Sequence, residues 1–169
     1  AKKINTKFNM GYDLFLSYAP ERENPGSKMK FKNVTKVCSG YSKNCLNLSK
    51  NLYQKIVKKV VIAKSLEEAE MSKLLENIYR SVNIGLVNEL KIISQAMKLN
   101  INNIIKLAST KPFGFKSFYP GPGTGGHCIP IDPYYLYWRA KEFNQEARFI
   151  KLAGEINIET TKWTIRNII

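Results

Sequence analysis

Apolar residues recur at intervals of three and four from residue 65 to about residue 99, which is the pattern of one face of a long helix. Ser65 followed by Glu68 forms a capping box that predicts where this helix begins. A helix of this length needs to bury its apolar stripe against other helices or a second subunit. The predicted stripe consists of Met71, Leu74, Leu75, Ile78, Tyr79, Val82, Leu86, Leu90, Ile93 and Met97.

Three apolar runs precede this helix and are predicted to be strands, at residues 12–18, 34–38 and 59–63. Helical spacing over residues 42–57 separates the last two runs. A strand, a helix and a second strand in this order are typical of a parallel sheet. Because three strands are few for such a sheet, we expect residues 1–64 to be the trailing part of an α/β domain.

The chain after the long helix is predicted to be helical. A short helix is expected over residues 102–108 and a final helix over residues 147–169. Between them, residues 111–130 are rich in proline and glycine and predict a loop. Asp132 and Pro133 predict the start of the next helix, with Asp132 as the N-cap and Pro133 at the first helical position. The fold class is therefore α/β followed by all-α.

The composition is that of a globular protein, because 44% of the residues are apolar. No apolar run approaches the roughly 18 residues of a membrane span. The N-terminus also lacks the apolar region of a signal peptide, so we expect a cytoplasmic protein with no membrane partner. Three cysteines at unrelated spacings predict free thiols and not a disulfide framework or a metal site.

Basic residues outnumber acidic ones 27 to 13, which gives a net charge of +14. Such a field attracts phosphate groups on small nucleotides or on nucleic acid. No recognised nucleic-acid module, and no basic helix interleaved with aromatic residues, accompanies the charge. We therefore expect no nucleic-acid partner, although a basic binding module without catalytic chemistry stays as an alternative.

The loop PGPGTGGHCIPIDP contains the letters of the GxGxxG dinucleotide fingerprint. That fingerprint requires a strand before it and a helix immediately after it. Here prolines and a glycine break the preceding residues, and the next helix cannot begin before Asp132. We therefore reject this interpretation and expect the glycines to bring bare backbone against a ligand.

Cys128 lies at the end of this loop, next to the single histidine, His127. A cysteine close to a helix N-terminus is a candidate nucleophile, whereas a buried cysteine is only a small apolar residue; the segment alone favours neither. Adjacent residues of an extended loop point to opposite sides, so we expect His127 to line the site and not to be its general base. An acyl-transfer enzyme using Cys128 and His127 without NAD is the alternative.

Three stretches resemble the nucleotide-sugar 6-dehydrogenases of the UDP-glucose and GDP-mannose dehydrogenase family. APERENPG is similar to the family's SPERxxPG, and AEMSKLLEN is followed downstream by VNE. The third stretch, GPGTGGHCIPIDPYYLYWRAKEF with RFIKLAGEIN, resembles the branch that oxidises UDP-N-acetylhexosamines. The stretches occur in family order and span residues 18–157.

The resemblance implies an NAD-dependent oxidation of the sugar C6 alcohol to a carboxylate, in the synthesis of polysaccharide precursors. UDP-N-acetylglucosamine is the expected substrate, with UDP-N-acetylmannosamine or UDP-glucose as alternatives. Residues 1–64 would be the end of a Rossmann-like NAD-binding domain, and residues 65–169 the helical central and dimerisation domain of a homodimer. The family's dinucleotide fold and UDP-binding domain are expected outside this sequence, so no cofactor-binding residues are assigned.

The resemblance also implies roles for individual residues. Cys128 matches the nucleophile that captures the intermediate aldehyde as a thiohemiacetal, which is then oxidised to a thioester. Lys73 and Asn77, one helical turn apart, match a pair that stabilises the oxyanion, although such residues are commonly solvated. Asp132 matches a carboxylate that works with the lysine through a water. Glu21 matches the acid/base carboxylate for thioester hydrolysis, although an ordinary exposed Glu is also found in such loops.

Substrate contacts are expected from the glycine loop and from two aromatic residues before it, with ordinary packing as the alternative for the aromatics. These residues are Phe118, Tyr119, Gly121, Gly123, Gly125 and Gly126. The chain departs from some family members at Pro25, where they carry a second Glu. It also lacks an arginine that some members place before the loop, for which Lys111 or Lys116 could substitute.

Overall fold

A computed structural model describes residues 8–23, 26–126 and 128–168. The chain divides into two compact units, Ala1–Lys73 and Leu74–Ile169. The fold is mixed α/β and mostly helical, with one small three-stranded sheet. The predicted fold class is confirmed at this level, whereas the assignment of residues 1–64 to a Rossmann-like domain stays a prediction.

The first unit holds the sheet, whose strands are β1 (Ser17–Tyr18), β2 (Lys36–Gly40) and β3 (Val60–Ile62), with a short 3₁₀ turn η1 (Phe31–Asn33) before β2. Helix α1 (Lys43–Gln54) connects β2 to β3, which pair in parallel as the sequence predicted. Gly40 allows α1 to begin directly against the sheet, because a side chain there would collide with the backbone of Leu46.

The predicted buried strand at residues 12–18 is wrong over most of its length. Only Ser17 and Tyr18 pair with β2, in the antiparallel direction, and Tyr12 is 77% exposed. The Asn9 carbonyl accepts the N–H groups of Tyr12 and Asp13, and the Asp13 carboxylate accepts the Asn9 N–H at 2.9 Å. These local hydrogen bonds form a tight turn in preference to a strand.

Helix α2 (Leu66–Ala96) crosses from the first unit into the second. As predicted, the Ser65 hydroxyl accepts the Glu68 N–H at 3.1 Å. The Glu68 carboxylate accepts the N–H of Lys64 and not that of Ser65, so the cap is a variant of the predicted box. In the second unit follow α3 (Ile101–Ala108), α4 (Asp132–Glu142) and α5 (Arg148–Arg166).

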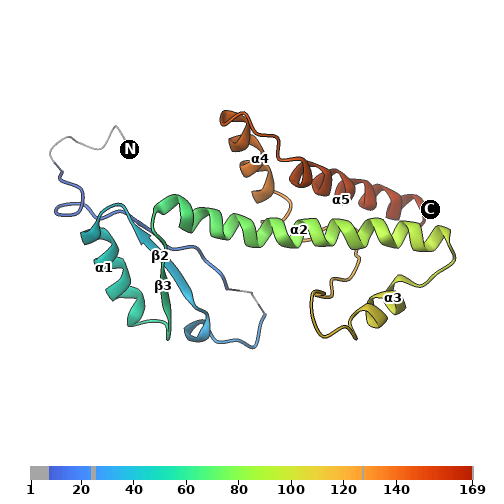
Figure 1. The fold of residues 1–169 in the computed structure, drawn as a ribbon, viewed down its shortest axis with the longest axis horizontal. Helices are drawn as coiled ribbons and strands as arrows, with labels where there is room; N and C mark the ends of the chain where they lie inside the picture. The colour runs from blue at the N-terminus through green and yellow to red at the C-terminus, as the bar shows by residue number, and fades with distance from the viewer. Residues whose placement is uncertain (1–7, 24–25, 127, 169) are drawn as a thin grey trace. The chain divides into compact units, whose positions relative to one another are not determined.

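Within the second unit, α5 runs along one side of α2, while α3 lies on another side (Figure 1). The side of α2 that packs on α5 is small and polar. The Gly85 position lies against Ala153 and Asn157 of α5, and Ser81 and Asn88 are buried. The predicted apolar stripe remains largely open in this chain: Leu75, Leu86, Ile93 and Met97 are exposed. Its burial against a second subunit stays a prediction.

The apolar core of this unit lies on the side of α3. Val87 of α2 packs with Ile101 and Ile105 of α3, and Phe118 from the following loop packs against them. The Phe118 ring also meets Tyr79 edge to face, with 5.7 Å between the ring centroids. This cluster fixes the start of the glycine-rich loop against α2.

Candidate active site

The glycine-rich loop ends in a turn that brings Cys128 and Asp132 together. Gly125 and Gly126 have φ values of +61° and +78°, which residues with a side chain rarely adopt. The Cys128 carbonyl accepts the N–H groups of Ile131 at 3.1 Å and Asp132 at 2.8 Å. Cys128 is exposed, so the alternative of a buried apolar cysteine is wrong.

Asp132 is the first residue of α4 and not its N-cap, which corrects the sequence prediction. The cap position is Ile131, and no side chain caps the helix. The Asp132 carboxylate instead accepts a hydrogen bond from the Asn77 amide of α2 at 2.6 Å. A tertiary partner on α2 has therefore replaced the local one that the sequence predicted.

Asn77 is completely buried, and both ends of its amide are engaged. Its oxygen accepts a hydrogen bond from Arg80 at 2.5 Å, while its nitrogen donates to Asp132. These two partners fix which way the amide is turned. Arg80 was not predicted from the sequence, although its position three residues after Asn77 places it on the same helix face.

A second pair of asparagines ties the beginning of the loop to the helices. The Asn88 oxygen accepts the Gly121 N–H at 2.9 Å, and its nitrogen donates to the Asn157 oxygen at 3.0 Å. The Asn157 nitrogen donates to the Ser81 carbonyl at 3.2 Å. Both asparagines are buried, and we call them the amide clamp. They were not predicted, although Asn77, Ser81 and Asn88 recur at helical spacing and form a polar stripe along α2.

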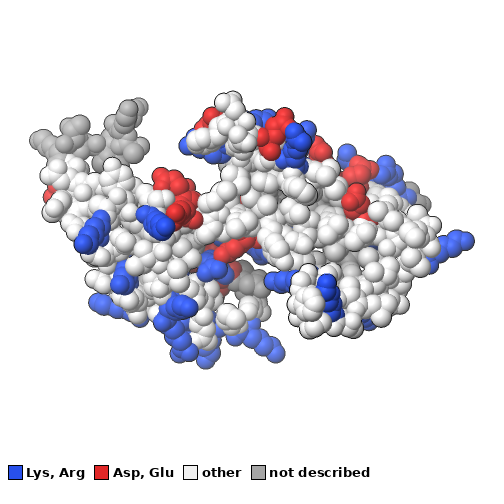
Figure 2. Space-filling model, in the orientation of Figure 1, with Lys and Arg blue, Asp and Glu red and all other residues white. Residues whose placement is uncertain are grey.

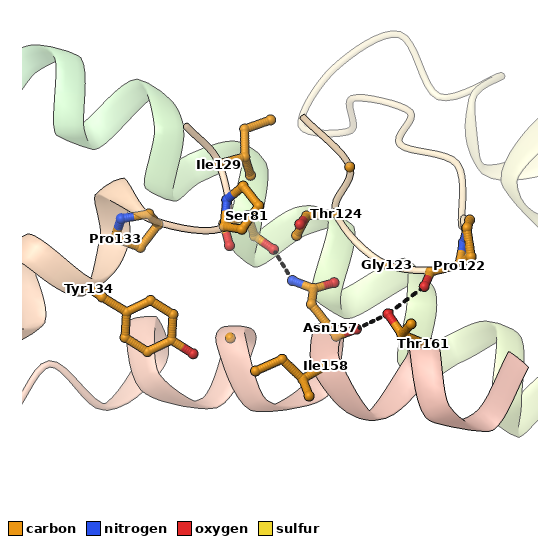
Figure 3. Close-up of a pocket in the computed structure, with 13 residues that line it drawn as sticks. Ser81, Pro122, Gly123, Thr124, Ile129, Pro133, Tyr134, Asn157, Ile158 and Thr161 are labelled. Carbon is orange, nitrogen blue, oxygen red and sulfur yellow. Dashed lines mark hydrogen bonds between the residues drawn. The ribbon is translucent and has the colours of Figure 1, made fainter. Parts of the chain in front are cut away.

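A pocket of about 310 Å³ lies between the loop, α4 and α5 (Figure 3). The loop contributes Gly123, Thr124 and Gly125, and the hydroxyl of Thr161 on α5 holds it by donating to the Pro122 carbonyl at 2.6 Å. The remaining lining residues are Ser81, Pro122, Ile129, Pro130, Pro133, Tyr134, Gly154, Asn157, Ile158 and Thr161. Cys128 and Asp132 are not among the lining residues, so the pocket adjoins their turn without containing it.

The other predicted substrate contacts lie in different surroundings. Gly121 is held by the amide clamp, and Gly126 precedes the turn at Cys128 and is not among the residues that line the pocket. Phe118 is partly buried and packs against the core. Tyr119 is exposed. Lys116 lies 6.0 Å from the centre of the Tyr79 ring, and Lys111 stacks on Phe113.

Glu21 follows β1 in the first unit and is tightly held. One carboxylate oxygen accepts the N–H groups of Arg22 and Glu23, both at 2.8 Å, and the other accepts the Lys36 ammonium at 3.0 Å. Partial burial raises the pKa of Glu21, but the Glu23 N–H, the Lys36 ammonium and the Arg22 N–H outweigh it, so the pKa lies below its usual value.

Lys73 is the last residue of the first unit, one helical turn before Asn77 on α2. Its approach to Cys128 stays a prediction. His127 and Pro25 lie outside the described residues. Among the residues that are described, no group of three His, Cys, Asp or Glu could hold a metal ion.

The surface carries side chains of both charges. On the face shown in Figure 2, Lys and Arg side chains lie over both units, with Asp and Glu among them. Within the described ranges, no helix has the length and apolar character needed to cross a membrane.

The glycine loop does not have the structure of a dinucleotide site. Among the described residues, no strand leads directly into the loop, and the next helix begins only at Asp132. The structure therefore agrees with the rejection of the GxGxxG fingerprint, and no residue of this loop is assigned to NAD.

Comparison with known proteins identifies relatives over most of the chain. Protein CapL of Staphylococcus aureus is 40% identical over 161 residues, which is 94% of this chain and 38% of CapL. The UDP-N-acetyl-D-glucosamine 6-dehydrogenase of Pseudomonas aeruginosa is 38% identical over 147 residues, covering 86% of this chain and 34% of that protein. The chain therefore spans well under half the length of these relatives.

The fold agrees with a solved structure of the UDP-N-acetyl-mannosamine dehydrogenase Cap5O from Staphylococcus aureus. The TM-score is 0.76 at 34% identity, over 94% of this chain and 37% of that one. The family model for the central domain of the UDP-glucose/GDP-mannose dehydrogenase family matches residues 67–159. The resemblance seen in the three sequence stretches is thus confirmed, and the chain belongs to the UDP-glucose/GDP-mannose dehydrogenase family.

Proposed function

We propose that the complete gene product containing this chain oxidises the C6 hydroxyl of a UDP-N-acetylhexosamine to a carboxylate. Relatives named for UDP-N-acetylglucosamine and UDP-N-acetylmannosamine support this substrate class. NAD⁺ is the oxidant of this family and would take up both hydrides as a co-substrate. The balance is R–CH₂OH + 2 NAD⁺ + H₂O → R–COO⁻ + 2 NADH + 3 H⁺.

Cys128 is the proposed nucleophile. After the first hydride leaves C6, the thiolate adds to the aldehyde carbon, a C–S bond forms, and the oxygen takes up a proton. Loss of the second hydride and of this proton leaves a thioester. Water attacks the thioester carbon, the C–S bond breaks, and the thiolate is regenerated. The exposed position of Cys128 beside Asp132, on a turn fixed by backbone hydrogen bonds, is the observation that carries this proposal.

Asn77 and Asp132 are proposed to work on the oxygen at C6. Their hydrogen bond sets one carboxylate oxygen of Asp132 against the amide, which supports a role for Asp132 as an orienter or base acting through a water. Lys73 is proposed to add a positive charge that stabilises the oxyanion. Arg80 is proposed as a positioning residue, because it holds the amide oxygen of Asn77.

Glu21 is proposed as the base that activates water for hydrolysis of the thioester. The pKa of this carboxyl lies below the usual value, so Glu21 is ionised at neutral pH, which is the protonation state that a general base needs.

A homodimer is proposed as the working assembly. The exposed apolar residues of α2, among them Leu86, Leu90 and Ile93, support this proposal because they could pack against an apolar surface of a second subunit. Sedimentation of the complete gene product at several concentrations tests this, and a monomer at every concentration would contradict it.

The activity is tested by following NADH with the complete gene product and UDP-N-acetylglucosamine, UDP-N-acetylmannosamine or UDP-glucose. We expect two NADH for each carboxylate formed, and loss of turnover in Cys128→Ala. Cys45→Ala is the matched control, because Cys45 is a buried thiol of α1.

The same preparations test the two alternatives. If no UDP-sugar yields NADH and the protein binds DNA with a steep salt dependence, the basic binding module is correct. If His127→Gln abolishes an acyl transfer that needs no NAD⁺, the alternative cysteine enzyme is correct.

A further inference from the structure

Lys36 is a buried lysine in the first unit. It is the first residue of β2, and only 4% of it is exposed. Its ammonium lies 5.3 Å from the centre of the Tyr53 ring and 5.7 Å from that of Phe31. It donates to one carboxylate oxygen of Glu21 at 3.0 Å. Lysine is among the residues least often buried, so this position calls for an explanation.

Burial of an ammonium group is costly unless partners replace the water that it loses. Here the faces of two aromatic rings and one carboxylate replace it. Replacement of a whole buried ion pair by apolar residues of similar volume is often neutral or stabilising. The stability of the unit therefore does not explain why this position is a lysine. We therefore ask what the lysine does for its partner, Glu21.

The two ends of the ion pair differ sharply in exposure. The Lys36 side chain is 6% exposed, whereas that of Glu21 is 60% exposed. The buried partner, Lys36, belongs to the sheet, and the accessible partner, Glu21, belongs to the loop after β1. Arg22, the neighbouring cation, has one guanidinium nitrogen on the Thr35 carbonyl at 2.9 Å. Together with the N–H groups of Arg22 and Glu23, Lys36 thus holds an accessible carboxylate in one orientation.

We propose that Lys36 is the positioning residue of Glu21: the ammonium, held between two aromatic rings, fixes the carboxylate that activates water against the thioester. The proposal rests on the proposed role of Glu21 in hydrolysis. In this proposal, Lys36 does not contact the substrate. It predicts that loss of Lys36 affects the hydrolysis of the thioester and leaves the two hydride transfers intact.

The first experiment compares Lys36→Met, Glu21→Gln and the double variant in the complete gene product. Methionine keeps the length of the side chain and suits a buried site, so we expect Lys36→Met to fold. We expect both single variants to form the thioester on Cys128 at the normal rate and to hydrolyse it up to about 100-fold more slowly. Mass spectrometry of the quenched enzyme detects the adduct. Lys32→Met, at an exposed lysine of the same segment, is the control.

The double variant separates positioning from packing. If Lys36 acts only through Glu21, its loss has no further effect once Glu21 is Gln, and the double variant hydrolyses the thioester as slowly as Glu21→Gln. Equal slowing of aldehyde formation and hydrolysis in Lys36→Met, or additive effects in the double variant, would overturn the proposal.

A second measurement does not depend on activity. The backbone N–H groups of Arg22 and Glu23 donate to Glu21, so their NMR shifts follow its titration. Without the ammonium, we expect the pKa of Glu21 to rise in Lys36→Met, so that both N–H signals titrate at a higher pH than in the parent protein. Unchanged titration would refute the positioning role. Absence of NADH formation by the unaltered enzyme would instead refute the proposed function, whatever the titration shows.

Discussion

The two units hold their proposed site residues by different physical means. In the first unit, a charged pair fixes Glu21, and the lysine end is buried between aromatic rings. In the second unit, the neutral amide clamp of Asn88 and Asn157 fixes the glycine loop from within the α2–α5 interface. A charged pair responds to pH and salt, whereas a network of buried neutral amides has no charge to titrate or to screen. The following experiments test that difference.

Replacement of Asn88 by Leu is expected to have the largest effect. The change removes two hydrogen bonds and leaves the Gly121 N–H and the Asn157 oxygen without this partner. We expect the free energy of unfolding of the 169-residue chain to fall by roughly 2–4 kcal/mol, equally at neutral and acid pH. Urea unfolding measures this. Asn83→Leu, at an exposed hydrogen bond of the same helix, should change it by less than about 1 kcal/mol.

Asn157→Asp should convert the neutral clamp into a pH-sensitive one. A carboxylate at this buried position would face the Ser81 carbonyl without a proton to donate, so we expect a loss of about 2–3 kcal/mol at neutral pH. Burial raises the pKa of the new carboxyl above its unfolded value. Stability is therefore retained below the unfolded pKa and lost as the pH rises through the folded pKa. A difference in the free energy of unfolding between variant and parent chain that stays constant across this pH range would contradict the expectation.

Glu21→Gln should cost less, about 1 kcal/mol at neutral pH, because the exposed carboxylate is partly screened by solvent. The pKa of Glu21 is lowered in the folded chain, so its contribution is present above the unfolded pKa and disappears as the pH falls through the folded pKa. The parent chain and the variant should therefore become equally stable in acid. A constant difference at all pH values would show that packing, and not charge, is responsible.

Salt should have the smallest effect and should act on one region only. Between about 0.05 M and 1 M NaCl, we expect the stability difference due to Glu21→Gln to shrink by a few tenths of a kcal/mol. The difference due to Asn88→Leu should not change. Equal salt responses in the two variants would remove the physical distinction between the two regions.

Much of the fold could be predicted because its signals are local. The Ser65 cap, the parallel pair β2 and β3, and the helices α1, α3 and α5 follow from spacing and from turn residues near each element. The strand predicted at residues 12–18 failed because apolar character does not distinguish a strand from a turn closed by Asn9 and Asp13. Asp132 failed as a cap because a distant amide competes for its carboxylate.

Some residues of the candidate site could be predicted from the sequence and others could not. Cys128, Asn77, Asp132 and Glu21 were named from motifs, whereas Arg80 and Lys36 were not. Nothing near Lys36 in the sequence marks it as buried, since lysines are common along this segment. Its burial depends on Phe31 and Tyr53, which the turn before β2 and the helix α1 bring to its ammonium.

The amino-acid sequence alone determined the order of the elements, the family motifs and the residue types available for chemistry, because these depend on neighbours within a few positions. Only the tertiary structure decided which side of α2 is buried, where the Asp132 carboxylate finds its partner, and which lysine holds Glu21. The physical reason is that a buried polar group needs a partner, and the partners of the buried Asn77, Asn88 and Lys36 lie far away in the sequence or on another element.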